Sequence, residues 1–334
     1  MGKIDVVVNR YCSDTERFAD LFNGVFFEGR QVVKSEELTL SSQVYRQTPI
    51  ALEQESGEGR PPEKELFLER TRDIKMTNRK GTAFRILAVE SENKVDYGMP
   101  FRMLQYDVME YQQQVNKIRR RNSWGRAGQR KKSGKLRKND RLWPVYTLCV
   151  YYGTKKWDGP RCLRDMMDFG TDEEGMSEFF ADYPFRLLCV NEMEDFSMFH
   201  TPLQDVFRLM QYRKDKEKML QLLEESPKYR ELDGETLELL AVVVDEPRIW
   251  ENRSKYKQEG GYNMCKAWKE MKKDARDEGR REGRREGILE GQLEGKQEGM
   301  RAAISYMMKN LHLTVEQALE ALEIPRVEWE RYLQ

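Results

Sequence analysis

The residues best suited to chemistry are two acidic side chains at the end of a predicted strand. Residues 84–92 read FRILAVESE, so an apolar run ends in Glu90 and Glu92. Residues i and i+2 of a strand point to the same face, so the two carboxylates would repel unless a cation lay between them. The pattern leaves two alternatives open, a metal site or a solvated strand end.

A predicted hairpin adds a third carboxylate. The turn TNRKG separates DIKM from TAFRILAVE, which predicts that residues 73–76 pair with residues 82–90. Asp73 begins the first strand and Glu90 ends the second, so both would lie at one end of the sheet. Mg²⁺ commonly takes one or two protein carboxylates and completes its shell with water and substrate phosphates. A metal ion held by Asp73 and Glu90 could activate water against a phosphodiester, as in metal-dependent nucleases.

Composition supports a metal held by oxygen ligands. The five cysteines are scattered without a CxxC pair, and the two histidines, His200 and His312, lie far apart. This argues against a zinc module and a disulfide framework and favours Mg²⁺ or Mn²⁺. The chain has 58 basic and 58 acidic residues, so a polyanion would have to bind through a local basic patch.

Such a patch lies within residues 117–141, where twelve Lys or Arg residues accompany a single acid, Asp140. Phosphate neutralisation by this segment would give salt-sensitive affinity for nucleic acid, and Trp124 could stack on an unpaired base. The alternative is a long insertion whose charge serves only solubility. The predicted nucleic-acid contacts are Arg119, Arg120, Arg121, Trp124, Arg126, Arg130, Lys131, Lys132 and Lys135.

Periodicity predicts the elements that position these residues. Ser13 and Glu16 form a capping-box pattern ahead of a helix. Pro100 begins a long helix, in which apolar residues spaced three and four apart predict a stripe facing the core. Two further strands are predicted at residues 143–153 and 185–190. The stripe comprises Phe101, Leu104, Val108, Tyr111, Val115 and Ile118.

From Met198 onward the sequence predicts helices. Six Glu-Gly pairs recur every four residues and end at Gly279, Gly283, Gly287, Gly291, Gly295 and Gly299. Each glycine costs a helix interior about 1 kcal/mol relative to alanine, so this segment is either a solvated charged tether or a glycine stripe that another helix approaches. Two short helices, after Thr314 and after Pro325, end the sequence; packing or oligomerisation suits them better than DNA binding, because acids balance bases.

Four motifs in order carry a family resemblance: RTRDIK, ILAVESE, YGMPFRMLQYD and YYGTKKWDGP. Together they resemble the recombination-promoting nuclease, or YhgA-like putative transposase, family of the PD-(D/E)XK nuclease superfamily. The resemblance covers roughly residues 10–300 and includes the glycine and glutamate repeats. It implies an α/β fold, with a restriction-endonuclease-like core and a mixed sheet, followed by an all-helical C-terminal region.

The resemblance implies roles for particular residues. Asp73 and Glu90 match the metal-binding acids of the family. Arg102 and Tyr106 match its helix positions and, one turn apart, share a face suited to meeting a phosphate. The acid that the superfamily often carries in its first helix would correspond to Glu16 or Asp20, between which the sequence does not choose.

Glu92 departs from the pattern, because the family usually has Gln there and the superfamily Lys, which orients the attacking water. Three alternatives follow. Glu92 ligates a second metal ion, or Lys75, on the same strand face as Asp73, supplies the missing cation, or the site has lost its activity.

We therefore expect a metal-dependent DNA endonuclease, with Mg²⁺ or Mn²⁺ as cofactor and DNA as partner; the association with recombination or transposition is implied by the resemblance alone. The alternatives are a catalytically inactive relative that acts as a nucleic-acid-binding or oligomeric scaffold protein, and a protein that contacts only other proteins. The C-terminal helices are candidates for homo-oligomer contacts.

No apolar run is long enough to span a bilayer and the N-terminus lacks a signal-peptide core, so we expect no membrane partner and a cytoplasmic location. The expected segments are a nuclease-like core at 10–195, a helical region at 196–260, the Glu-Gly helix or tether at 261–310 and a small helix-turn-helix-like tail at 311–334.

Overall fold

The computed structural model describes five stretches of the chain, residues 3–47, 68–78, 86–123, 134–171 and 175–332. Two compact units divide the chain, residues 1–267 and residues 268–334. The four segments predicted from the sequence are a finer division and stay a prediction.

A five-stranded mixed sheet forms the centre of the first unit, which confirms the predicted α/β class. Its strand order is β1-β4-β5-β6-β7. Pairing is antiparallel from β1 to β5 and parallel from β5 to β7. The strands are β1 (Leu38–Leu40), β4 (Ile74–Asn78), β5 (Ile86–Glu92), β6 (Val145–Tyr151) and β7 (Arg186–Cys189), and a separate antiparallel pair joins β2 (Val44–Gln47) to β3 (Leu68–Thr71).

The predicted hairpin is present, since β4 pairs with β5. The strands predicted at residues 143–153 and 185–190 correspond to β6 and β7. Residues 79–85, including the first part of the second hairpin strand, lie outside the described residues.

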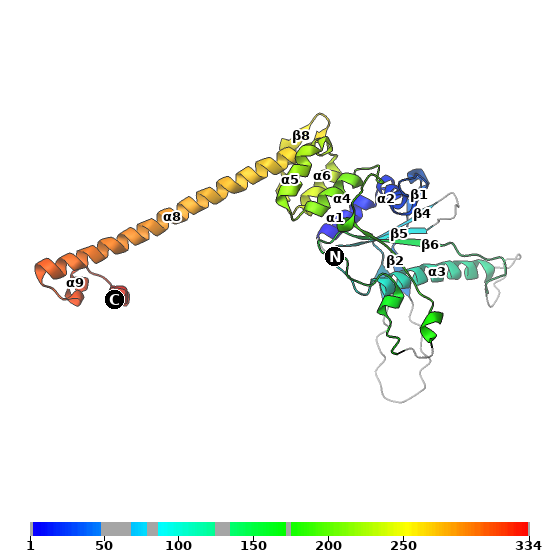
Figure 1. The fold of residues 1–334 in the computed structure, drawn as a ribbon, viewed down its shortest axis with the longest axis horizontal. Coiled ribbons are helices and arrows are strands. Elements are labelled where there is room, and N and C mark those ends of the chain that lie inside the picture. Colours follow the sequence, from blue (N-terminus) through cyan, green and yellow to red (C-terminus); the bar gives the residue numbers. More distant parts are fainter. Residues whose placement is uncertain (1–2, 48–67, 79–85, 124–133, 172–174, 333–334) are drawn as a thin grey trace. The chain divides into compact units, whose positions relative to one another are not determined.

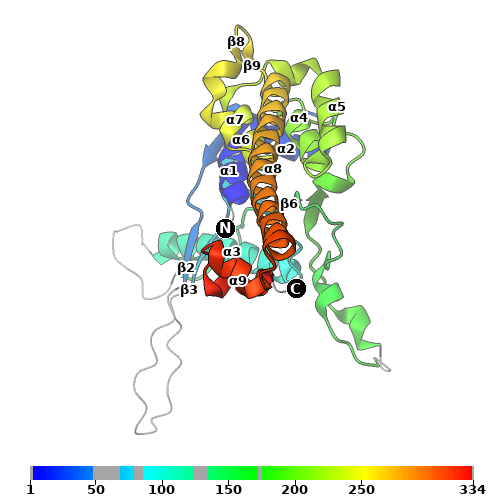
Figure 2. The ribbon, with the colours of Figure 1, turned by 90° about the vertical axis from the view of Figure 1, so that its left-hand side faces the viewer.

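Helices cover both faces of the sheet, with α1 (Lys3–Cys12) and α2 (Thr15–Phe27) on one side and α3 (Met99–Ser123) on the other (Figure 1, Figure 2). The predicted cap of α2 is wrong by one residue. The Asp14 carboxylate accepts hydrogen bonds from the backbone N–H groups of Glu16 and Arg17. The Ser13 hydroxyl instead donates to the Asn9 carbonyl.

The long helix predicted from Pro100 is present as α3, but the apolar stripe predicted for it is only partly correct, since Ile118 is buried and two other members of the stripe are exposed. Phe101 and Val108 are 49% and 51% exposed. The buried face of the helix carries Asp107, Glu110 and Gln114 among its methionines. Periodicity of apolar residues cannot find a buried face whose side chains are polar and paired.

Cationic groups from the sheet side hold two of these polar side chains. Arg72, whose side chain is fully buried, donates to Asp107 Oδ1 at 2.5 Å. Lys75 on β4 donates to Glu110 Oε2 at 3.0 Å. These two ion pairs attach α3 to the sheet and fix the helix over β4, β5 and β6.

The helices that follow the sheet belong to the same unit. Residues 201–225 form two helices rather than one continuous run, because the Asp215 side chain accepts from the backbone N–H of Lys218 and begins a new helix. A short hairpin with two residues in each strand, β8 and β9, also interrupts the region predicted as helical. The elements are α4 (Leu203–Tyr212), α5 (Lys216–Glu225), α6 (Gly234–Val243), α7 (Arg248–Glu251), β8 (Lys257–Gln258) and β9 (Gly261–Tyr262), with short 3-10 helices at Ser35–Glu37, Leu163–Met166, Met176–Phe179, Val190–Glu192, Pro227–Arg230, Arg253–Tyr256 and Arg326–Arg331.

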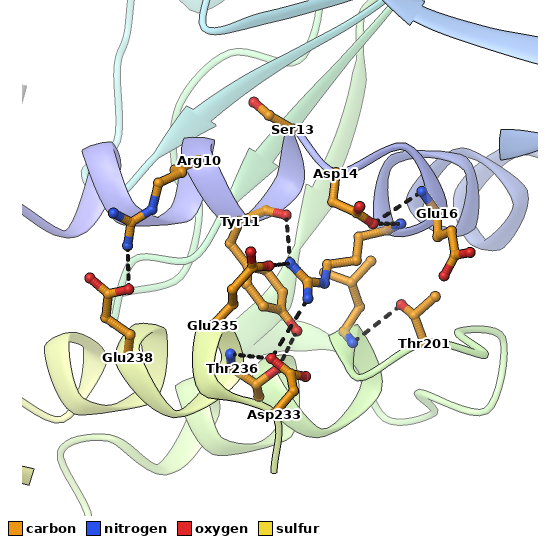
Figure 3. Close-up of polar contacts among 12 residues, drawn as sticks. Arg10, Tyr11, Ser13, Asp14, Glu16, Thr201, Asp233, Glu235, Thr236 and Glu238 are labelled. Atoms are coloured by element: carbon orange, nitrogen blue, oxygen red, sulfur yellow. Dashed lines mark hydrogen bonds and ion pairs between the residues drawn. The ribbon is translucent and has the colours of Figure 1, made fainter. Parts of the chain in front are cut away.

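Polar contacts attach the first helices to α6 (Figure 3). Arg10 of α1 pairs with Glu238 at 2.7 Å, and the hydroxyls of Tyr11 and Thr236 lie 2.9 Å apart. Arg17 of α2 adds an ion pair with Glu235 at 2.5 Å. These bonds join the helical region to the layer that covers the sheet.

The Glu-Gly repeats lie in one long helix, α8 (Met264–Leu311), which is continuous through all six glycines. A Cβ built on any of these glycines would meet no atom within 4 Å. The alternative of a second helix packed on the stripe therefore has no support among the described residues. The helix is charged along its length, and every helix in the described residues is too short or too polar to cross a bilayer.

The tail folds onto the end of α8 within the second unit. Thr314 caps α9 (Val315–Ala321) through a capping box with Gln317. Ile304 of α8 is buried against α9 and the segment that follows it, so the two predicted C-terminal elements are present. The cluster comprises Ile304, Ala318, Leu319 and Ile324.

Candidate active site

Asp73 and Glu90 are brought together by the pairing of β4 with β5, as the hairpin predicted. Ile74 lies opposite Val89, so Asp73, immediately before β4, comes opposite Glu90. The backbone N–H of Ser91 donates a 2.9 Å hydrogen bond to Asp73 Oδ2 and fixes this carboxylate at the end of the sheet. Directly opposed residues of an antiparallel pair point to the same face, so the two carboxylates are neighbours.

Glu90 is the most deeply buried member of the group, with 1% of its surface exposed. Burial, followed by the nearby Asp73 carboxylate, raises the pKa of Glu90 to about 8. Glu90 Oε1 has no hydrogen-bond partner among the described residues. A buried carboxylate oxygen without a partner is costly, which makes this atom a candidate ligand for a cation.

Arg102 of α3 lies between the paired glutamates. Its guanidinium donates to Glu92 and to Asp96 Oδ2, the latter at 2.9 Å, and lies 3.7 Å from Glu90 Oε2. A cation therefore does lie between the two carboxylates at the end of FRILAVESE, and it belongs to the chain itself. Burial raises the pKa of Glu92, and Arg102 acts against this shift. The phosphate contact expected of Arg102 stays a prediction.

The other two predicted site residues are engaged elsewhere on the same sheet face. The Lys75 ammonium is held by Glu110, and the two side chains are 8% and 4% exposed. The Tyr106 hydroxyl donates to the Thr71 carbonyl at 3.1 Å. Both bonds position α3, and the catalytic roles expected of Lys75 and Tyr106 stay predictions.

Neither acid proposed for the first helix lies beside Asp73. Glu16 is exposed, and the buried Asp20 carboxylate accepts hydrogen bonds from the His200 and Thr201 backbone N–H groups at 2.8 to 3.0 Å. Asp20 thus orders the residues that lead into α4. It holds a loop and is unavailable as a ligand beside Asp73.

The helix that does reach the site is α1, which the sequence reasoning missed. Burial raises the pKa of Asp73, and two residues of α1 also affect this pKa. The Asn9 side chain lowers it, and the negative charge of Asp5 raises it further. Asn9 is 8% exposed. The signal was present in the sequence, because Val8, Tyr11 and Cys12 have helical spacing and are buried, but the run VVV is typical of a strand.

The side chains present could supply only part of the coordination shell of Mg²⁺ or Mn²⁺. No group of three or more His, Cys, Asp or Glu side chains is arranged to hold a metal ion in the described parts of the chain. Asp73 and Glu90 offer two carboxylates, one with an unpartnered buried oxygen. Two carboxylates suffice for Mg²⁺ when water and substrate phosphate complete its shell.

The basic segment is described only at its two ends. Arg119, Arg120 and Arg121 end α3 as exposed residues, and Lys135 is exposed beyond it. Asp140 accepts from Arg121 at 2.7 Å and from the Asn122 amide at 2.7 Å, so the single acid holds the ends together. The remaining predicted contacts lie outside the described residues: Trp124, Arg126, Arg130, Lys131 and Lys132.

A basic cavity of about 700 Å³ lies between α3 and the sheet. Lys117, Arg121 and Arg141 line it together with Trp143, which is 39% exposed. The Gln114 amide donates to the Trp143 carbonyl at 3.1 Å and accepts from its N–H at 2.7 Å, which fixes the tryptophan on α3. The sequence analysis named Trp124 as the candidate stacking residue and did not consider Trp143.

Residues 73–236 match the model of a protein family described as "Putative transposase, YhgA-like". The match begins at Asp73 and includes the acids, α3 and β6. A search of the curated proteins and one of the solved structures found no match.

Proposed function

Because the chain belongs, through residues 73–236, to the YhgA-like family of putative transposases, we propose that it is a metal-dependent DNA endonuclease that acts in recombination or transposition. The reaction is hydrolysis of a phosphodiester bond. The recombination or transposition setting rests on the family.

The observation that carries the proposal is the buried Asp73 and Glu90 pair. Two opposed carboxylates on one sheet face repel each other, and burial strengthens that repulsion. The unpartnered Glu90 Oε1 adds a second cost. A divalent cation on Asp73 and Glu90 would relieve both costs, which supports a metal site here rather than a solvated strand end.

Different groups of the chain would have different roles around that ion. Mg²⁺ or Mn²⁺, when bound, would supply a water of lowered pKa and stabilise charge on the phosphodiester. The Ser91 N–H holds Asp73 in place. Arg102 keeps Glu92 and Glu90 from repelling each other and, at 27% exposure, can also reach a phosphate.

Exposed basic residues at the C-terminal end of α3, the end away from Arg102, support DNA as the substrate. Arg119, Arg120 and Lys135 are exposed, and no ion pair involves them among the described residues. Lys117 and Arg141 line the cavity beside Trp143. Cations that neutralise phosphates, with an aromatic ring for stacking, are the pattern of nucleic-acid-binding surfaces.

A second candidate function is a nucleic-acid binder that no longer cleaves. Glu92 occupies the position of the superfamily's lysine and is paired with Arg102, and Lys75 is held by Glu110. Lys75, the lysine on the same strand face as Asp73, is therefore not free to orient water. This observation favours binding without catalysis.

Cleavage of supercoiled plasmid with Mg²⁺ or Mn²⁺ separates the two functions. We expect nicking by the intact chain and its loss in Asp73→Asn and Glu90→Gln. Glu194→Gln, an exposed acid with no side-chain partner in the described residues, is the matched control and should cleave normally. Mn²⁺ binding followed by electron paramagnetic resonance should weaken in the same two variants. Salt-sensitive DNA binding without metal-dependent nicking would support the second candidate instead.

A further inference from the structure

A second cavity, of about 910 Å³, lies at the carboxyl ends of the parallel strands β5 and β6. The segment that follows Glu92 forms one wall, and the loops after β6, α4 and α6 form the others. Its volume is in the range of pockets that hold small ligands. In α/β proteins, ligands bind preferentially at this end of parallel strands.

Arg213 is the unusual group in this cavity. It ends α4, and its Nη1 is fully buried and without a hydrogen-bond partner in the described residues. No salt bridge to Arg213 is formed within the described parts of the chain. Burial lowers the pKa of this guanidinium, and only the Tyr152 and Tyr151 hydroxyls oppose the shift. The accessible part of this half-buried arginine lines the cavity, and no carboxylate neutralises its charge among the described residues, so the cavity offers a cation to an anionic ligand.

The remaining charges of the lining favour an anion carrying more than one negative charge. Four cations face two carboxylates, Asp158 and Asp245, and the Asp158 carboxylate accepts a 3.0 Å hydrogen bond from Tyr97. The ammonium groups of the three lysines have no partner among the residues described. The four cations are Lys94, Lys155, Arg213 and Lys214.

Apolar and aromatic groups share the lining with these charges. The Tyr97 ring is 61% exposed at the rim, and Val95, Val244 and Pro247 form apolar wall. A phosphate joined to a flat, weakly polar body suits such a mixture, because cations bind the phosphate and the ring stacks on the base. A nucleotide has this chemistry.

We infer that this cavity binds the phosphate of a nucleotide, either free or as a unit of the strand that the chain cleaves. The strand form rests on the proposed nuclease function. Lys94 comes two residues after Glu92, a span of at most about 7 Å. A strand bound in this cavity would therefore pass close to Glu92, at the end of the sheet that carries Asp73.

The test is binding of a fluorescein-labelled single-stranded oligonucleotide, followed by anisotropy in EDTA. Binding without divalent metal probes the cavity whether or not the chain cleaves DNA, so failure here and failure of the nuclease proposal are distinguishable. We expect Arg213→Gln to weaken binding about tenfold or more. Lys216→Gln, an exposed residue of α5 outside the cavity, removes the same charge and is the matched control.

Two further readouts separate a binding role from a structural one. The slope of log affinity against log salt should become shallower by about 0.7 in Arg213→Gln, the value for one phosphate of a single strand. Arg213 Nη1 makes no hydrogen bond in the described residues, so its removal leaves no buried acceptor without a partner. The melting temperature of ligand-free Arg213→Gln should therefore not fall below that of Lys216→Gln.

Adenosine monophosphate as competitor identifies the source of the phosphate. Displacement of the oligonucleotide by the mononucleotide, lost in Arg213→Gln, supports a free nucleotide as ligand. Arg213-dependent binding of the oligonucleotide without such displacement supports the strand. Equal affinity and equal salt dependence of Arg213→Gln and Lys216→Gln would overturn the inference.

Discussion

Replacing Asp107 tests the polar attachment of α3. Asp107 Oδ1 accepts from Arg72 at 2.5 Å and from the Thr147 hydroxyl at 2.7 Å, and Oδ2 accepts from Tyr183 at 2.6 Å. Asp107→Asn keeps the shape of the side chain and removes its charge. The Arg72 side chain is fully buried and Asp107 is 9% exposed, so water cannot replace the lost carboxylate.

The expected loss of stability is large. Removing one partner of a buried ion pair typically costs about 3–5 kcal/mol, because the other charge stays buried without compensation. For a unit of this size, each 1 kcal/mol corresponds to about 2–4 °C. We therefore expect Asp107→Asn to lower the melting temperature by about 6 °C at the least.

Urea unfolding followed by circular dichroism measures this loss. Glu194→Gln is the control for removal of an exposed carboxylate and should change stability by less than about 0.5 kcal/mol. The double variant Arg72→Met/Asp107→Leu removes both charges and should recover part of the loss. A cost below about 1 kcal/mol for Asp107→Asn, as for a surface ion pair, would refute the argument that this pair anchors α3.

Three further predictions concern the acids and the long helix. Burial and Asp73 raise the pKa of Glu90 to about 8, so the folded state keeps a proton that the unfolded state loses above about pH 4.5. Stability should therefore fall as pH rises between these values, and Glu90→Gln should reduce that fall in melting temperatures measured across this range. Arg102→Gln leaves Glu90 and Glu92 without the cation between them, so its loss of stability should be greater at pH 9 than at pH 5. Gly287→Ala should stabilise α8 by about 1 kcal/mol, seen as slower amide hydrogen exchange, because a Cβ there meets no atom within 4 Å.

The juxtaposition of Asp73 and Glu90 could be predicted because its signal is local. Turn residues between two β-type runs fix a hairpin, and the hairpin alone places Asp73 opposite Glu90. The positions of these strands along the chain and the C-terminal helices followed from similar local patterns. These are the parts of the structure in which neighbours in sequence are neighbours in space.

Contacts between distant residues could not be predicted in this way. The buried face of α3 depends on Arg72 and Lys75, which precede Asp107 and Glu110 by 35 residues each. Arg213 likewise follows Glu92 by more than a hundred residues before it reaches the same end of the sheet. The residue pattern of one segment does not indicate which distant segment will supply the charge that pairs with it.

The exposed glycines of α8 have a geometric consequence. Four residues of α-helix rise about 6 Å and turn about 400°, so each Glu-Gly unit advances the helix like a screw by about 6 Å and about 40° beyond a full turn. No atom within 4 Å packs on these glycines, so gain or loss of a unit would disturb no contact. The number of units would then set both the separation and the angular setting between Trp268, near the start of α8, and the α9 cluster, in discrete steps. The repeat can therefore act as a spacer whose length changes without unfolding either end.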